Sequence, residues 1–218
     1  MFRVMLYSQW KWSRLVVLLG SVAGFALPLI SVHGAARADS SPLQAPELLH
    51  AVQAWGVLYP VLAATLGLLV AIASWTPDHR GRHVYALALP LPRWRYVLLR
   101  FGAGALLLAA PITAVLVGAL LATWSAAIPA GLQGYPVALG VRFALAVLVA
   151  FAVFFAVSAG TARTAGIILS LIGGVMLVQV IASVARVDVD LVGKLQLLVL
   201  NWPGPLAIFT GRWMLIDV

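Results

Sequence analysis

The sequence predicts an all-α fold, a polytopic bundle of transmembrane helices, and three observations lead to this prediction. The first is composition: 63% of the 218 residues are hydrophobic and only 9% are charged, against about a quarter charged in a soluble domain. The second is a series of long apolar runs, and the third is an uneven distribution of Lys and Arg between them. Too few polar residues remain to cover a water-soluble fold of this size.

Five apolar runs are long enough to cross a bilayer, which takes about 20 helical residues. They are Leu15–Val32, Ala51–Trp75, Tyr96–Trp124, Val137–Ser158 and Ala165–Ala185. A weaker stretch, Leu195–Gly211, is interrupted at Asn201–Pro205, where two prolines and a glycine cannot continue a straight helix. We therefore expect one transmembrane domain over residues 1–218, with five spans and a broken or re-entrant sixth element on the outer side within residues 186–212.

Basic residues indicate the orientation, because cytoplasmic loops of membrane proteins are rich in Lys and Arg. Three precede the first span and five lie in or beside the connection between the second and third spans: Arg3, Lys11, Arg14, Arg80, Arg82, Arg93, Arg95 and Arg100. This distribution predicts a cytoplasmic N-terminus in a multi-pass protein.

Residues 1–14 have the pattern of an interfacial helix. Arg3, Lys11 and Arg14 share one face with Tyr7, and apolar side chains lie opposite. The same residues could simply be the basic flank of the first span. A cleaved secretory signal is a further alternative, because Ala36-Arg37-Ala38 before Asp39 resembles a cleavage site. We expect the N-terminus to be retained.

Several functional classes lack the residues they need. There is no cysteine and no G-x-x-x-x-G-K-[ST] sequence, so neither a thiol metal site nor a bound nucleotide is expected. His79 and His83 share a helix face but have no third ligand nearby. No carboxylate or histidine is central in a predicted span, which argues against proton-driven transport. We expect no enzyme activity, cofactor, metal or nucleic-acid partner; the net charge of +8 reflects the cytoplasmic flanks.

The connection between the second and third spans, residues 76–95, is the most informative segment. Thr76 is a suitable N-cap, Pro77 suits the first helical position, and Asp78 complements the helix dipole. Pro90 should end such a helix near Leu89. We therefore predict a short cytoplasmic helix, Thr76–Leu89, in a connection far longer than two spans require. The alternative is a helix that only lies on the lipid surface.

This connection resembles the first cytoplasmic loop of type-2 ABC exporter permeases, the membrane subunits of ATP-binding-cassette exporters. That loop commonly has an acidic residue, a glycine, then Leu-x-Leu-Pro and a basic residue opening the next span. The matching positions are Asp78, Gly81, Leu87, Leu89, Pro90, Arg93 and Arg100. The order of a surface helix, spans and coupling helix is also similar along the chain.

The resemblance implies export or flipping of a substrate across a prokaryotic cytoplasmic membrane, with energy from a separate nucleotide-binding ATPase subunit. The expected ATPase contacts are Asp78, Arg80, Gly81, Arg82, Leu87, Leu89, Pro90 and Arg93. A second permease copy or a homologous permease would complete the path.

Two questions stay open at this point. Family members usually have six spans, so here the sixth is either absent or formed by Leu195–Ile216. The rival function is a non-transport assembly or anchoring subunit of a larger membrane complex. Small-residue pairs such as Gly102-x-Gly104 and Gly173-Gly174 would allow close helix packing in either case.

Overall fold

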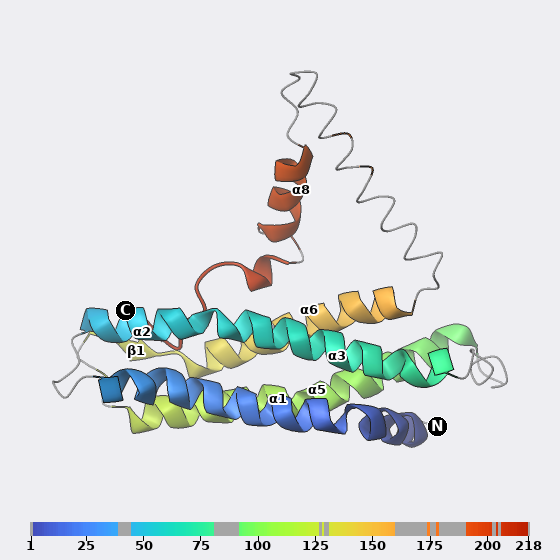
Figure 1. Ribbon diagram of the computed structural model, residues 1–218, viewed down its shortest axis with the longest axis horizontal. Helices are drawn as coiled ribbons and strands as arrows, with labels where there is room; N and C mark the ends of the chain where they lie inside the picture. The colour runs from blue at the N-terminus through green and yellow to red at the C-terminus, as the bar shows by residue number, and fades with distance from the viewer. Residues whose placement is uncertain are drawn as a thin grey trace. The chain divides into compact units, whose positions relative to one another are not determined.

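The computed structural model describes residues 2–38, 45–80, 92–126, 128, 131–159, 174, 178, 191–201, 204 and 206–217. They fall into two compact units, each considered by itself. Unit 1 contains residues 1–155 and 212–218, and unit 2 contains residues 156–211. The described chain is almost entirely helical (Figure 1), so the predicted all-α class is confirmed.

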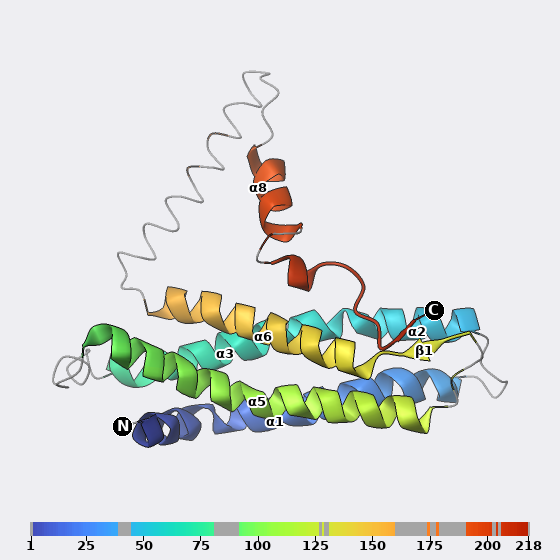
Figure 2. The ribbon, with the colours of Figure 1, turned by 180° about the vertical axis from the view of Figure 1, so that it is seen from behind.

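Unit 1 is a bundle of long helices that run side by side (Figures 1 and 2). In chain order its helices are α1 (Phe2–Ala38), α2 (Ala45–Gly56), α3 (Leu58–Arg80), α5 (Arg93–Ser125) and α6 (Pro136–Ser158). Among the described residues, four segments are long and apolar enough to cross a membrane: Phe2–His33, Val52–Asp78, Arg93–Ser125 and Pro136–Ser158. They correspond to the first four predicted spans. The fifth, Ala165–Ala185, lies outside the described residues except for Gly174 and Val178, both helical.

Two boundaries differ from the prediction. A turn at Val57 separates α2 from α3, so Pro60 lies in the first turn of a helix, where its missing N–H costs no hydrogen bond. At the other end, α3 continues through Thr76 and Pro77 to Arg80. Thr76 is therefore not an N-cap; its hydroxyl donates to the carbonyl of Ile72 at 2.8 Å, inside the helix.

The first 14 residues do not form a separate helix, because α1 is continuous from Phe2 to Ala38. The N-terminal turns nevertheless point in a different direction from the rest of α1 (Figures 1 and 2). Arg3, Lys11 and Arg14 are exposed, whereas Gln9 and Ser13 are buried. The three basic residues are thus exposed, and the two residues buried in these turns are polar; whether the turns lie on the membrane surface stays a prediction.

Glycines allow the long helices to pack closely. A Cβ on Gly118 of α5 would clash with the backbone carbonyl of Phe25 in α1. A Cβ on Gly67 of α3 would lie 2.6 Å from the Cβ of Ala150 in α6. Of the small residues singled out in the sequence, Gly104 faces the ring of Phe151, while Gly102 and Gly174 have room for a Cβ.

Residues 212–217 return to unit 1 and close one end of its bundle. Strand β2 (Ile216–Asp217) pairs antiparallel with β1 (Gln133–Gly134), in the α5–α6 connection. The Trp213 ring stacks on the ring of Tyr59 in α3, with 6.3 Å between the ring centroids. The Arg142 guanidinium of α6 lies over the same Trp213 ring, 4.4 Å from its centroid. We call this the strand end. The N-terminus of α1 lies at the opposite end (Figures 1 and 2).

In unit 2, helix α8 (Leu191–Leu200) stops directly before the proline- and glycine-containing sequence. The chain then reverses, because the N–H of Leu206 donates to the carbonyl of Val199 at 3.0 Å, and a 3-10 helix, η1 (Ala207–Phe209), follows. This reversal, between Val199 and Leu206, contains the predicted interruption at Asn201–Pro205. Whether this element is re-entrant stays a prediction.

Candidate functional site

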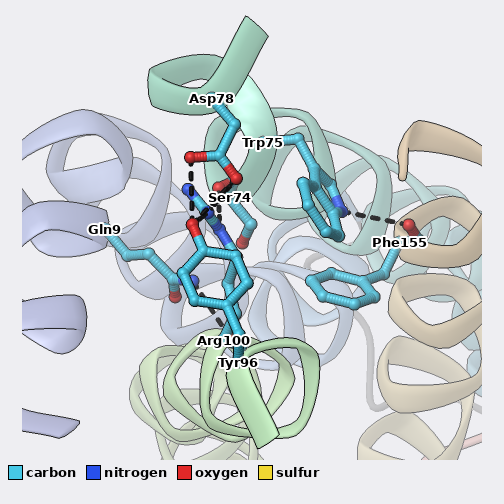
Figure 3. Close-up of polar contacts among 7 residues, drawn as sticks. All are labelled: Gln9, Ser74, Trp75, Asp78, Tyr96, Arg100 and Phe155. Atoms are coloured by element: carbon cyan, nitrogen blue, oxygen red, sulfur yellow. Dashed lines mark hydrogen bonds and ion pairs between the residues drawn. The ribbon is translucent and has the colours of Figure 1, made fainter. Parts of the chain in front are cut away.

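An ion pair buried between Asp78 of α3 and Arg100 of α5 is the main polar feature of unit 1 (Figure 3). Asp78 is 3% exposed and Arg100 is 6% exposed. Charged groups inside a membrane protein are costly unless paired, and they commonly mark functional positions. This end of the bundle is called the ion-pair end below.

The Arg100 guanidinium binds both helices that flank residues 81–91. Its Nη1 donates to the Asp78 carboxylate and to the Tyr96 hydroxyl, and its Nε donates to the Ser74 carbonyl at 2.6 Å. The Tyr96 hydroxyl donates in turn to the two Asp78 oxygens, at 3.0 and 2.8 Å. Charge-assisted bonds of this kind are the stronger class of hydrogen bond.

Helical spacing explains why these groups meet. Ser74 and Asp78 are four residues apart near the end of α3, and Tyr96 and Arg100 are four apart near the start of α5. Residues at this spacing lie on one face of a helix. α5 therefore presents the Tyr96 and Arg100 side chains to α3, which presents the Asp78 carboxylate and the main-chain carbonyl of Ser74; the Ser74 hydroxyl donates to the Val70 carbonyl within α3.

Two further helices join the same cluster. The Gln9 side chain of α1 donates to the Arg100 carbonyl at 3.0 Å. On the other side, the guanidinium lies 5.0 Å from the centroid of the Trp75 ring, whose indole N–H donates to the Phe155 carbonyl of α6 at 3.1 Å. The cluster thus connects all four long helices of unit 1, as Figure 3 shows.

Aromatic side chains exclude solvent beside the ion pair. The rings of Trp75 and Phe155 are 5.1 Å apart, and Phe101 lies 5.1 Å from Phe151 and 5.4 Å from Phe155. Such surroundings strengthen a paired charge and penalise an unpaired one. The cluster is suited to holding helix ends together. It has no nucleophile–base pair, and no metal-binding group of three His, Asp or Glu occurs among the described residues.

Of the predicted ATPase-contact residues that the structure describes, Asp78 is the one whose contacts place it in this cluster. Asp78, expected as a polar residue of a connecting helix, is instead buried in α3. Arg80 is the last residue of α3, and Arg93, the first of α5, is exposed. The other expected contact residues lie outside the described residues: Gly81, Arg82, Leu87, Leu89 and Pro90.

Sequence reasoning missed several members of the cluster, among them Gln9, Ser74, Trp75 and Tyr96. A usable signal was present, because polar residues recur four apart on both sides of the connection. Comparison of the chain with protein-family models, with curated proteins and with solved structures finds no match. Function is therefore argued from the residues themselves.

Proposed function

We propose that this chain is the membrane-spanning permease subunit of an ATP-binding-cassette exporter. It would move or flip a substrate across the cytoplasmic membrane of a prokaryote. A separate nucleotide-binding subunit would hydrolyse the ATP and contact residues 81–91 and their flanks. A second copy, or a homologous permease, would supply the other half of the path.

The observation that carries this proposal is the position of the buried ion pair. Asp78 and Arg100 join the end of α3 to the start of α5, on either side of residues 81–91. A force applied to that connection would reach two helices already held together by charge-assisted hydrogen bonds. Through Gln9 and Trp75 it would also reach α1 and α6. A connection of this kind suits a subunit driven from outside itself.

The distribution of charge supports the orientation that the proposal needs. Arg3, Lys11, Arg14, Arg93 and Arg95 are exposed at the ion-pair end. Cytoplasmic ends of spanning helices carry such an excess of Lys and Arg. The ion-pair end would then face the compartment that contains ATP.

The test begins with purification of the full chain from its own membrane in mild detergent. We expect an ATPase subunit to co-purify, and its ATP hydrolysis in liposomes to depend on this chain. Asp78→Asn and Arg82→Glu should each lower that hydrolysis several-fold. Arg212→Glu is the matched control, because Arg212 is exposed at the strand end, and it should leave hydrolysis unchanged.

A stable complex without any ATPase would contradict the proposal and favour the rival, a membrane assembly or anchoring subunit. An imposed pH gradient without ATP gives a second check. The Asp78 carboxylate is held by Arg100 and Tyr96 and is not proposed as a proton carrier. Substrate accumulation driven by that gradient alone would overturn the ATP-driven mechanism.

A further inference from the structure

Exposed cations and aromatic rings gather on two neighbouring helix ends of unit 1. We call this set the basic collar; its cations are Arg3, Lys11, Arg14, Arg93 and Arg95, and its rings are Tyr7, Trp10, Trp12 and Trp94. The residues numbered 3 to 14 belong to α1, and those numbered 93 to 95 belong to α5. The Gln9–Arg100 hydrogen bond joins the two helix ends.

Among the residues of unit 1 that the structure describes, no exposed acidic side chain lies beside the collar. Residues 2–38 and 92–126 contain no Asp or Glu. Asp78, the one described acidic side chain at the ion-pair end, is 3% exposed and is already paired with Arg100. The five collar cations therefore present an uncompensated positive surface.

The neighbouring side chains indicate which anion this surface meets. Tyr7 is 72% exposed and Trp94 is 60% exposed, with the guanidinium of Arg95 lying 5.1 Å from the Trp94 ring centroid. Tyr and Trp favour the headgroup layer of a bilayer, where one part of the ring is apolar and another is wet. Within one or two turns the exposed residues become aliphatic, as at Leu15 and Leu98. An acidic water-soluble protein could pair with the cations but would leave that apolar surface uncovered.

We propose that the basic collar binds the phosphate headgroups of anionic phospholipids in the cytoplasmic leaflet. Lys and Arg next to such a leaflet are attracted by its negative surface potential, and the attraction weakens with salt. The lipids would hold the N-terminal turns of α1 in the membrane surface. Because Gln9 joins those turns to Arg100, lipid binding would also fix α1 beside the buried ion pair. This surface is independent of the ATPase and its ATP.

The experiment measures lipid preference around the collar in the intact protein. The chain has no cysteine, so Val4→Cys, at a residue that is 72% exposed and is not a member of the collar, introduces a single site for a fluorescent probe. The labelled protein is placed in nanodiscs of phosphatidylcholine with phosphatidylglycerol. Either one lipid or the other carries bromine, which quenches the probe on contact. We expect brominated phosphatidylglycerol to quench about threefold more than brominated phosphatidylcholine at equal mole fraction, and the difference to shrink in high salt.

Two charge-removing variants and a matched control make the result specific. Lys11→Gln with Arg14→Gln, and Arg93→Gln with Arg95→Gln, should each reduce the preference by at least about half. Lys194→Gln with Arg212→Gln removes the same charge from exposed residues outside the collar and should leave the preference intact. Circular dichroism and gel filtration check that each variant is folded. The effect of salt on the lipid preference is measured on the labelled protein with all five collar cations in place, so it does not depend on the folding of any charge variant.

Equal quenching by the two lipids would overturn the proposal, as would a preference that survives in both collar variants. Equal quenching would instead indicate that the cations face water or an acidic protein. No ATPase or ATP enters this measurement. A negative result therefore leaves the permease proposal standing, and a failed ATPase experiment does not alter the lipid result.

Discussion

At the scale of single residues, the buried pair of Asp78 and Arg100 holds the end of α3 to the start of α5. Both match the loop that the sequence resembles, but the prediction placed Asp78 in a separate connecting helix. The reason was Thr76-Pro77, which has the pattern of a helix start. In the structure α3 runs through Pro77, since neighbouring helices can re-satisfy the backbone that a proline disrupts in a membrane bundle.

Removal of both ion-pair partners should destabilise the protein by less than the sum of the two single removals. Asp78→Asn leaves the Arg100 charge buried without its counter-ion, at a cost of roughly 3 kcal/mol or more. Arg100→Gln should cost a similar amount. The double variant leaves no unpaired charge, so its loss of stability should be smaller than the sum of the two. Thermal unfolding of all four proteins in one detergent measures the coupling, and strict additivity would show that the pair is not formed.

At the scale of helices and strands, the apolar runs predicted the long elements because length and hydropathy alone identify them. They did not predict which glycines would lie between helices, since close contact depends on how two distant segments face each other. Gly118 has a backbone neighbour where a Cβ would be, whereas Gly102, chosen from the sequence, has a single carbon 3.9 Å away.

Alanine should therefore lower the stability of the protein at Gly118 but not at Gly102. Gly118→Ala would force α5 away from the backbone of α1 at Phe25, with a cost of about 1–3 kcal/mol typical of overpacking. Gly102→Ala adds a methyl group at ordinary van der Waals distance from the Phe2 ring and replaces a poor helix former, so it should be neutral or slightly stabilising. Unfolding temperatures in detergent compare them, and equal effects would contradict the packing of α1 on α5.

The strand end was beyond prediction because its strands are only two residues long and lie far apart in the chain. Sequence patterns identify strands from alternation over at least four residues. What builds this end is tertiary contact: Trp213 is 3% exposed, and Leu215 and Ile216 are fully buried. The Tyr135 N–H also donates to the Leu215 carbonyl at 2.8 Å.

The register of β1 and β2 can be tested by a disulfide. Gln133 pairs directly with Asp217, so the Gln133→Cys, Asp217→Cys variant should oxidise readily. Gln133→Cys with Arg212→Cys has the same number of thiols but is out of register, and it should remain reduced. Because the chain has no cysteine of its own, gel mobility under non-reducing conditions reports the pairing directly. Equal oxidation of both variants would contradict the register.

At the scale of the whole molecule, the path of the chain restricts its membrane topology. Helix α6 begins at the strand end and runs to the ion-pair end, where Phe155 meets Trp75. Residues 212–217 are back at the strand end, paired with β1. If the four long helices span the membrane, Phe155 and Arg212, both in unit 1, lie on opposite sides of it. With the orientation proposed above, Asp217 would lie on the outer side.

Single cysteines labelled in intact cells test this topology. Cysteine at Gln133 or Asp217 should react with a membrane-impermeant maleimide added outside. Cysteine at Arg93 or Lys11, at the ion-pair end, should react only after the membrane is opened. Labelling of Asp217→Cys only after opening would place Asp217 on the same side as the ion-pair end and would contradict its pairing with β1 at the strand end.

The central claim is that residues 81–91, carried by the helices that Asp78 and Arg100 join, receive force from an ATPase subunit. The most direct measurement is a cross-link from a cysteine at Arg82 in membranes that contain the complete complex. A short thiol-to-amine reagent should join Arg82→Cys to a nucleotide-binding subunit, and ATP should change the yield. Gln133→Cys, at the strand end, should give no such product. Absence of an ATPase from the Arg82→Cys product, or an equal yield from both positions, would contradict the account.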